Sequence, residues 1–281
     1  MEKRVLGKTG RSLSVVGFGG IVVTDTDPKD AAAYVKEAIR RGINYFDVAP
    51  TYGNAEDRLG PALAPYRDGV FLACKTIKRT RREAAEGLKD SLQKLRTDHF
   101  DLFQMHGVSD MDEVAQILGP GGALEAFKEA RDKGLIKHIG FSAHSEEAAL
   151  ALLDAFAFDS ILFPFNFACW YEGGFGPKVL EAAKKKGVGI LALKSLAKRS
   201  WGDGEKRAWP KCWYAPVDTK EEAALALRWT LSQGVTAAVS PSHAELLWWM
   251  CDAAEKYKPI SEKESAGLKK SAKGLKVIFP H

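Results

Sequence analysis

Strand-like apolar runs alternate with segments of helical periodicity along the whole chain, and this alternation constrains the fold more than any other feature. The eight strand candidates are VVGFGG (15–20), INYFDVA (43–49), VFLACKT (70–76), FDLFQMHG (100–107), IKHIGFSA (136–143), SILFPFN (160–166), VGILALKS (188–195) and TAAVSPS (236–242). Segments with helical signals, such as DPKDAAAYVKEAIRRG (27–42), separate them. Strands that alternate with helices form parallel sheets, and eight such units close into a barrel. We therefore predict an α/β fold, a (β/α)8 TIM barrel with eight helices.

The helix-stop glycines and turn signals along the chain support one domain over residues 1–281. Gly42, Gly134, Gly187 and Gly234 stand where helices are expected to stop. The start, RVLGKTGRSLS, predicts a β-hairpin about Lys8-Thr9-Gly10, and the tail 261–281 predicts an extra helix followed by an irregular end. An open doubly wound sheet is the competing fold, but GFGGIVV lacks the GxGxxG turn that such a sheet would carry after its first strand.

Charge and cysteine usage exclude several classes of protein. The net charge is +5 and scattered, and the densest basic run, Lys184 to Lys186, is best placed at a solvated helix end. This argues against a nucleic-acid partner. The sequence shows neither a signal peptide nor an apolar run long enough to span a membrane. The four cysteines are far apart and follow no metal-ligand spacing, so we expect a cytoplasmic protein without a metal. Its oligomeric state is not predicted.

Four ionisable residues fall at or just beyond the ends of three consecutive strands. Asp47 ends INYFDVA, Tyr52 follows in the next loop, Lys75 ends VFLACKT and His106 ends FDLFQMHG. In a parallel barrel the carboxyl ends of the strands meet at one face, where such barrels carry their active sites. A cation beside a phenol stabilises the phenolate and lowers the pKa of the phenol. The four residues therefore predict a proton-transfer site with Tyr52 as a general acid.

At this point the chain resembles the aldo-keto reductase superfamily over nearly its whole length. The resemblance is carried by RVLGKTGRSLSVVGFGG, GINYFDVAPTYGNAEDRLG, VFLACKT, FDLFQMHG, GLIKHIGFSAHS and ALRWTLSQGVTAAVSP, all in family order. It implies that Tyr52 protonates a carbonyl oxygen and that Lys75 lowers the pKa of Tyr52. It further implies that Asp47 pairs with Lys75 and that His106 hydrogen-bonds the substrate carbonyl.

The same resemblance implies a nicotinamide cofactor, NADPH, with NADH as the alternative. The residues expected to bind it are Gly20, Ser142, Leu193, Lys194, Ser195, Ser240, Ser242 and His243. The chain departs from the family at several positions of this site. Ala143 stands where many relatives have Asn, Leu162 replaces a common Gln, and Leu193 replaces a stacking aromatic residue. The Arg and the Glu-Asn pair of the eighth unit are missing, so we expect only a modest preference for NADPH, sharpened toward pH 6 by protonation of His243.

The longest stretch without periodicity is the loop 198–219, which follows the seventh strand. Loops of this length in a compact domain are often functional. Its aromatic residues Trp201, Trp209, Trp213 and Tyr214 suit either packing of the loop onto the barrel or a substrate pocket. In the second interpretation Trp213 and Tyr214 line the pocket together with Trp170 and Tyr171 of FACWYEGG.

The sequence thus predicts an NADP-dependent reductase that acts on a small aldehyde or ketone and reversibly oxidises alcohols. Its substrate is not predicted. Two alternatives stay open. One is a barrel lyase in which Lys75 or Lys194 forms a Schiff base, and the other is a nicotinamide-binding regulatory protein with little turnover.

Overall fold

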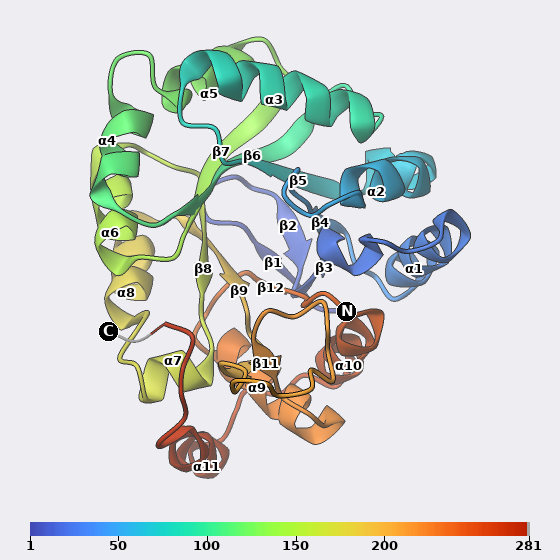
Figure 1. Cartoon of the computed structure of the whole chain (residues 1–281), viewed down its shortest axis with the longest axis vertical. Helices are drawn as coiled ribbons and strands as arrows, with labels where there is room; N and C mark the ends of the chain where they lie inside the picture. The colour runs from blue at the N-terminus through green and yellow to red at the C-terminus, as the bar shows by residue number, and fades with distance from the viewer. Residues whose placement is uncertain (280–281) are drawn as a thin grey trace.

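The computed structural model describes residues 1–279 and contains a closed barrel of eight parallel strands (Figure 1). The order around the barrel is β12-β3-β4-β5-β6-β7-β8-β9. The strands are β3 (Val16–Gly19), β4 (Tyr45–Asp47), β5 (Phe71–Thr76), β6 (Phe100–Val108), β7 (Ile136–Ala143), β8 (Ser160–Pro164), β9 (Gly189–Leu193) and β12 (Ala237–Val239). All eight predicted strands are present, and the (β/α)8 prediction is confirmed.

Several strands are shorter than predicted because side chains or backbone turns end them. β8 stops at Pro164 because Asn166 caps the next helix, its side chain accepting from the Cys169 N–H at 2.8 Å. β9 stops at Leu193 because Lys194 takes a positive φ of 59°. The periodicity of apolar residues in the sequence predicts neither of these two strand ends.

Helices surround the barrel and form its outer layer. They are α1 (Pro28–Arg40), α2 (Ala55–Leu63), α3 (Arg81–Lys94), α4 (Met111–Leu118), α5 (Ala123–Asp132), α6 (Glu146–Ala155), α7 (Phe167–Tyr171), α8 (Pro177–Lys186), α9 (Lys220–Ser232), α10 (Ala244–Glu255) and α11 (Glu262–Ala272), with short 3-10 helices at Gly20–Val23 and Ala64–Gly69. The four predicted helix-stop glycines all have positive φ. The tail helix is α11; residues 280–281 of the predicted tail lie outside the described residues.

The predicted number of eight barrel helices is too small, since α4 and α7 are additional. The connection from β6 to β7 holds two helices because Gly119-Pro120-Gly121-Gly122 interrupts it. Gly121 has a φ of 73°, a conformation that no helix continues through. Within residues 1–279, none of the helices combines the length and apolar character that a membrane span requires.

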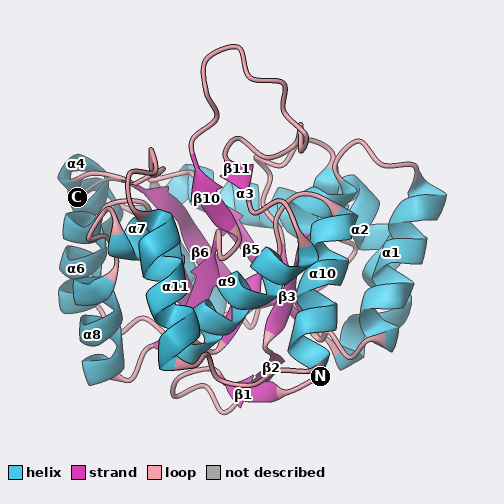
Figure 2. Cartoon of the chain, turned by 90° about the horizontal axis from the view of Figure 1, so that it is seen from below, coloured by secondary structure: helices cyan, strands magenta, loops and turns pink. Residues whose placement is uncertain are grey.

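The predicted N-terminal hairpin closes one end of the barrel. Strand β1 (Lys3–Val5) pairs antiparallel with β2 (Ser12–Ser14), and Leu6 and Leu13 are fully buried against the barrel interior with Tyr45 and Phe71. Figure 2 shows this hairpin at one end of the barrel and the long loop projecting from the other. Only the carboxyl end of the barrel is therefore open to a ligand.

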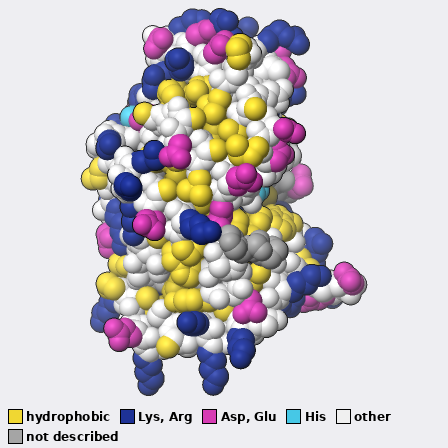
Figure 3. Space-filling model, turned by 90° about the vertical axis from the view of Figure 1, so that its left-hand side faces the viewer, with side chains coloured by type: hydrophobic (Ala, Val, Ile, Leu, Met, Phe, Trp, Pro, Cys, Tyr) yellow, Lys and Arg dark blue, Asp and Glu magenta, His cyan; other side chains and the backbone are white. Residues whose placement is uncertain are grey.

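The loop 198–219 leaves and rejoins the barrel through a short two-stranded sheet, β10 (Ala197–Arg199) with β11 (Ala215–Pro216). The chain returns to this end once more after α11, where Phe279 stacks on His144 with ring centroids 5.2 Å apart. On the face that carries α6 and α8, Lys and Arg side chains are interspersed with Asp and Glu (Figure 3). That face therefore presents a mixed charge rather than a continuous basic surface.

Candidate active site

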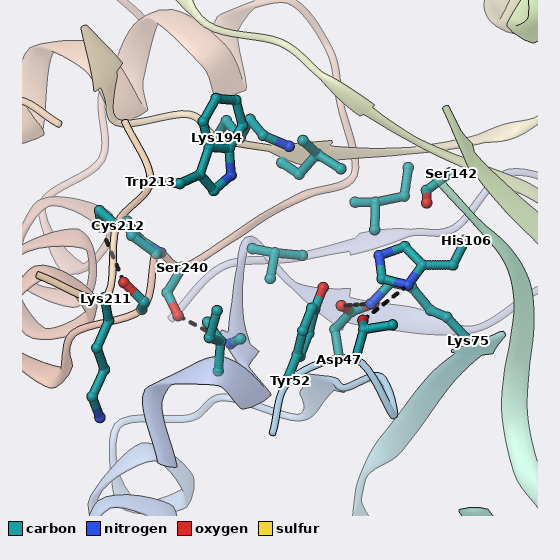
Figure 4. A pocket seen from close by; sticks show the side chains of 18 of the residues that line it. Asp47, Tyr52, Lys75, His106, Ser142, Lys194, Lys211, Cys212, Trp213 and Ser240 are labelled. Carbon is teal, nitrogen blue, oxygen red and sulfur yellow. Dashed lines mark hydrogen bonds and ion pairs between the residues drawn. The ribbon is translucent and has the colours of Figure 1, made fainter. Parts of the chain in front are cut away.

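A cavity of about 390 Å³ opens at the carboxyl end of the barrel, and all four predicted catalytic residues line it (Figure 4). The other lining residues are Gly19, Ile21, Thr51, Ser142, His144, Leu162, Leu193, Lys194, Lys211, Cys212, Trp213, Tyr214, Val239, Ser240, Pro241 and Ser242. This volume lies at the lower end of the range for small-molecule sites, roughly 300–1,000 Å³.

Asp47 and Lys75 form a buried ion pair at the floor of the cavity. They lie on neighbouring strands β4 and β5 and are 2% and 1% exposed. The Lys75 ammonium donates to Asp47 Oδ1, while Asp47 Oδ2 accepts from the Tyr45 hydroxyl at 3.0 Å and from the Gln104 amide at 3.2 Å. Burial disfavours the ammonium, but the Asp47 carboxylate, together with Tyr52 and Cys74, more than offsets burial and raises the pKa of Lys75. Lys75 is therefore a fixed cation.

Tyr52 lies above this cation, with Lys75 Nζ 5.2 Å from its ring centroid. Burial raises the pKa of Tyr52 and the Lys75 ammonium lowers it, and the sum leaves the pKa above its ordinary value. Lys75 thus acts in the predicted direction, but burial is the larger effect. The phenol is fully protonated at neutral pH, which is the state that a proton donor requires.

His106 completes the group of four at the end of β6. Its ring packs edge-on against Tyr52, with centroids 5.8 Å apart and planes at 89°, and Nδ1 lies 3.4 Å from Thr51 Oγ1. Burial and the nearby Lys75 cation lower the pKa of His106 to about 2. A neutral imidazole at this point can donate one N–H to a ligand oxygen without carrying charge.

Five of the eight predicted cofactor residues also line the cavity: Ser142, Leu193, Lys194, Ser240 and Ser242. Ser142 Oγ accepts from the Gly107 N–H at 2.8 Å, which leaves its hydroxyl hydrogen free to be donated to a ligand. Ser240 Oγ accepts from the Gly19 N–H at 3.0 Å, and a Cβ at Gly19 would come within 2.5 Å of the Ser240 carbonyl oxygen. Only glycine at position 19 therefore allows β3 to lie this close to the backbone of Ser240, which precedes α10.

Gly20, Ser195 and His243 lie outside the cavity lining. Gly20 packs against Val48, which a Cβ would meet at 2.8 Å, and Ser195 is fully buried beneath the turn at Lys194. His243 is turned under the long loop, where its Nε2 accepts from the Lys211 N–H at 3.2 Å and its ring packs on Trp209. Burial and the Lys211 cation lower the pKa of His243. The structure therefore does not support the predicted protonation of this histidine near pH 6.

The predicted substrate pocket is divided between two regions. Trp213 and Tyr214 line the cavity, but Trp170 and Tyr171 do not. They lie on α7 and face α9 and α11, Trp170 against Trp229 with centroids 5.4 Å apart and Tyr171 with its hydroxyl 2.7 Å from Ser265 Oγ. The reason is the short helix after β8, which sequence periodicity does not reveal.

The other two loop tryptophans have packing roles. Trp201 donates from Nε1 to the Cys212 carbonyl at 2.9 Å, and Trp209 packs on Trp249 with centroids 5.6 Å apart.

Residues that the sequence did not single out complete the cavity, above all His144, Lys211 and Cys212. His144 directly follows β7, so the strand-end rule that identified His106 could have identified it. Lys211 and Cys212 come from the long loop, where no periodicity exists. The Lys211 ammonium donates to the Thr24 carbonyl, so the loop reaches across the cavity to the segment after β3.

Comparison with known proteins agrees with this architecture. A sequence model described as the aldo/keto reductase family matches residues 15–209. The uncharacterized oxidoreductase YqkF of Bacillus subtilis is 32% identical over 157 residues, 51% of this chain and 49% of that protein. L-galactose dehydrogenase of Arabidopsis thaliana is 29% identical over 214 residues, 70% of this chain and 66% of that protein. The chain thus spans about half to two thirds of the length of these curated relatives.

Among solved structures, the holo form of an aldo-keto reductase from Bacillus halodurans superposes with a TM-score of 0.77 at 25% identity, covering 97% of both chains. The family match covers more than half of the chain and agrees with the closed barrel. The chain belongs to the aldo/keto reductase family.

Proposed function

We propose that the protein is a single-domain reductase over residues 1–281 that reduces an aldehyde or ketone with NADPH and reversibly oxidises the alcohol. The observation that carries this proposal is the buried Asp47–Lys75 pair beneath Tyr52 and His106, facing one cavity. The other pockets among residues 1–279 are lined by charged side chains at the surface, such as Asp57, Asp90, Lys94 and Arg96, rather than by a buried ion pair. The test is consumption of NADPH with a panel of aldehydes and ketones.

The residues around the cavity fit a nicotinamide dinucleotide. The donor at Ser142 and the apolar side chain of Leu193 would accommodate a flat ring with an amide group. The chemistry that the bound cofactor supplies is hydride transfer to the carbonyl carbon.

Each of the four residues then has a distinct role in proton transfer. His106, neutral and held against Tyr52, donates to the carbonyl oxygen and orients it. Tyr52 gives its proton to that oxygen as negative charge develops there. Lys75 stabilises the resulting phenolate, and Asp47 keeps the ammonium in place. Because Asp47 and Lys75 are buried, these interactions are stronger than they would be in solvent.

The start of α10 is the proposed site for the adenosine 2′-phosphate. Helix N-termini present free N–H groups to anions, and Ser240 and Ser242 add hydroxyl groups just before this twelve-residue helix. We expect the dissociation constant of NADPH to be on the order of 10-fold lower than that of NADH. One or two charge-assisted hydrogen bonds to the phosphate would produce a difference of this size.

His243 is expected to leave the pH dependence of this preference unchanged, because burial and the Lys211 cation lower its pKa and disfavour its charged form. The measurement is the dissociation constant of each cofactor at both pH values in wild type and His243→Ala. The phosphate itself titrates near pH 6, so the two proteins are compared at each pH. A preference that sharpens toward pH 6 in wild type but not in the variant would restore His243 as a charged phosphate ligand.

A Schiff-base lyase is a second candidate, and a property of Lys194 favours it. Burial lowers the pKa of Lys194 to about 7, so that near neutral pH part of the population carries the neutral amine that a Schiff base requires. Lys75 lacks this property because Asp47 keeps it charged. Borohydride added with an aldehyde should attach no mass to the protein if it is a reductase, whereas a labelled Lys194 would support the lyase. Carbonyl-dependent NADPH oxidation likewise separates an enzyme from a regulatory protein that only binds the cofactor.

All four cysteine thiols are free and buried, which supports our proposal that the protein acts in the reducing cytoplasm. The proposed partners are the cofactor and a small carbonyl compound.

A further inference from the structure

Lys194 is a cation that lines the wall of the cavity and has no role in the proposed proton transfer. It directly follows β9, which lies opposite β5 in the barrel order, so it faces the cavity from across Lys75. Its φ of 59° is a backbone conformation that side chains other than glycine rarely adopt. Residues held in such conformations cluster at ligand sites because the surrounding structure keeps them there.

The ammonium of Lys194 is held in one place by neutral groups. Nζ lies 3.0 Å from His144 Nε2, 5.5 Å from the ring centroid of Trp213 and 5.4 Å from that of Phe279. His144 in turn stacks on Phe279. Burial and the Lys194 cation lower the pKa of His144 to about 3, so this histidine is neutral and accepts a hydrogen bond.

Lys194 has no acidic partner within ion-pair distance among residues 1–279, unlike Lys75 and the neighbouring Lys198, which pairs with Glu222 at 2.9 Å. A half-buried ammonium without a carboxylate is unfavourable on its own. The missing negative charge is one that a ligand in the cavity can supply.

The direction of the side chain separates Lys194 from the proposed phosphate site. β9 lies between β8 and β12, and the phosphate site is at the start of α10, after β12. The bond to His144, which follows β7, shows that the Lys194 side chain reaches across β8 and away from β12. In Figure 4 its amine points toward the side of the cavity where His106 and Ser142 lie.

We propose that Lys194 binds a carboxylate of the substrate, so that the protein reduces oxo-acids, compounds that carry an aldehyde or ketone together with a carboxylate. The proposal rests on the reductase function proposed above. Tyr52 and His106 hold the carbonyl end, and Lys194 holds the acidic end against the aromatic rings of Trp213 and Phe279. Both rings lie within 5.5 Å of the ammonium and cover part of it, which strengthens an ion pair formed there.

The test compares matched aldehydes with and without a carboxylate. The pairs are 3- and 4-carboxybenzaldehyde against benzaldehyde, and succinic semialdehyde against butanal, each with saturating NADPH. In wild type, kcat/KM for at least one acid should exceed that of its uncharged partner on the order of 10- to 100-fold, as expected for a charge-assisted hydrogen bond. Lys194→Met should abolish this ratio through KM, and Lys194→Arg, which keeps the charge, should retain part of it.

The matched control is Lys198→Met, which removes a lysine bound to Glu222 outside the cavity and should leave the ratio as in wild type. The dissociation constant of NADPH is measured in every variant. An unchanged ratio in Lys194→Met overturns the proposal, as does a loss confined to NADPH affinity, which would assign Lys194 to the cofactor phosphates. A preference for 4-formylphenyl phosphate over 4-carboxybenzaldehyde would show that Lys194 binds a phosphate of the substrate. The proposal that it binds a carboxylate would then be wrong.

The pH dependence gives a readout that a purely structural lysine would not produce. The groups that face Lys194 are His106 on β6, His144 after β7, Cys169 on α7 and Lys75 on β5. Burial is the largest cause that lowers the pKa of His106, so this ring is neutral. Burial keeps His144 and Cys169 neutral, and Lys75 stays charged. Only Lys194 titrates near neutral pH, and its ammonium is present below its pKa of about 7. The preference for the acid should therefore fall as pH rises above 7 in wild type and be flat in Lys194→Met.

Failure of the reductase function is distinguishable from failure of this proposal. If wild type oxidises NADPH with none of these aldehydes, the reductase function is wrong. Calorimetric titration of 4-carboxybenzaldehyde and benzaldehyde into wild type and Lys194→Met then tests the anion site without turnover. Equal binding of both compounds by both proteins would eliminate the site.

Discussion

Replacement of Tyr52 by phenylalanine is expected to lower the rate of carbonyl reduction on the order of 10²–10⁴, the usual value of general acid catalysis. The ring keeps its edge contact with His106 and its position above Lys75, so stability should change little. The dissociation constant of NADPH should be nearly unchanged, because the phenol is needed for the proton and not for the cofactor. The measurement is kcat for the best substrate, with NADPH binding followed separately.

Tyr214→Phe is the matched control. Tyr214 is a buried tyrosine of the same cavity, but no lysine lies over its ring among the cation–π contacts of residues 1–279. Its removal should change kcat far less than Tyr52→Phe does. Near wild-type turnover in Tyr52→Phe, or equal losses in both variants, would contradict the assignment of Tyr52 as the acid.

Lys75→Met is expected to reduce kcat about as much as Tyr52→Phe, and the double variant should be little worse than either. Residues that act as one unit are not additive. Losses that multiply in the double variant would show that Lys75 and Tyr52 act independently.

Lys75→Met should also destabilise the fold by about 3–5 kcal/mol, because it leaves the Asp47 carboxylate buried without its cation. Asp47→Asn added to Lys75→Met removes that charge and should recover much of the stability, as measured by denaturant unfolding, while leaving the protein inactive. Recovery of activity together with stability would mean that Lys75 has only a structural role.

The strand ends were the part of the site that could be predicted from sequence. Asp47, Lys75 and His106 are each identified by the end of an apolar run, and the barrel rule then brings them to one face. The loop contacts could not be predicted in this way. Trp170 was placed in the pocket because its segment follows β8, and only the cap at Asn166 turns it away.

The ionisation states of the side chains around the cavity could not be predicted from the sequence either. The lowered pKa of His243 depends on the position of Lys211 in a loop without periodicity. The isolation of Lys194 from acidic side chains is likewise a property of the folded cavity. Sequence spacing identifies which residues can titrate, but burial and neighbours decide which of them do.

The cavity and its surroundings combine barrel strands with segments outside the barrel. This division has a consequence for how the selectivity for the carbonyl substrate can be changed. Asp47, Lys75 and His106 belong to barrel strands whose hydrogen bonds fix them, whereas Trp213 and Phe279 come from segments outside the barrel. Diversifying positions 213 and 279 in a laboratory library should therefore redirect the enzyme to other carbonyl compounds without disturbing proton donation. Proposed proton transfer and proposed substrate selection therefore depend on different segments of the chain.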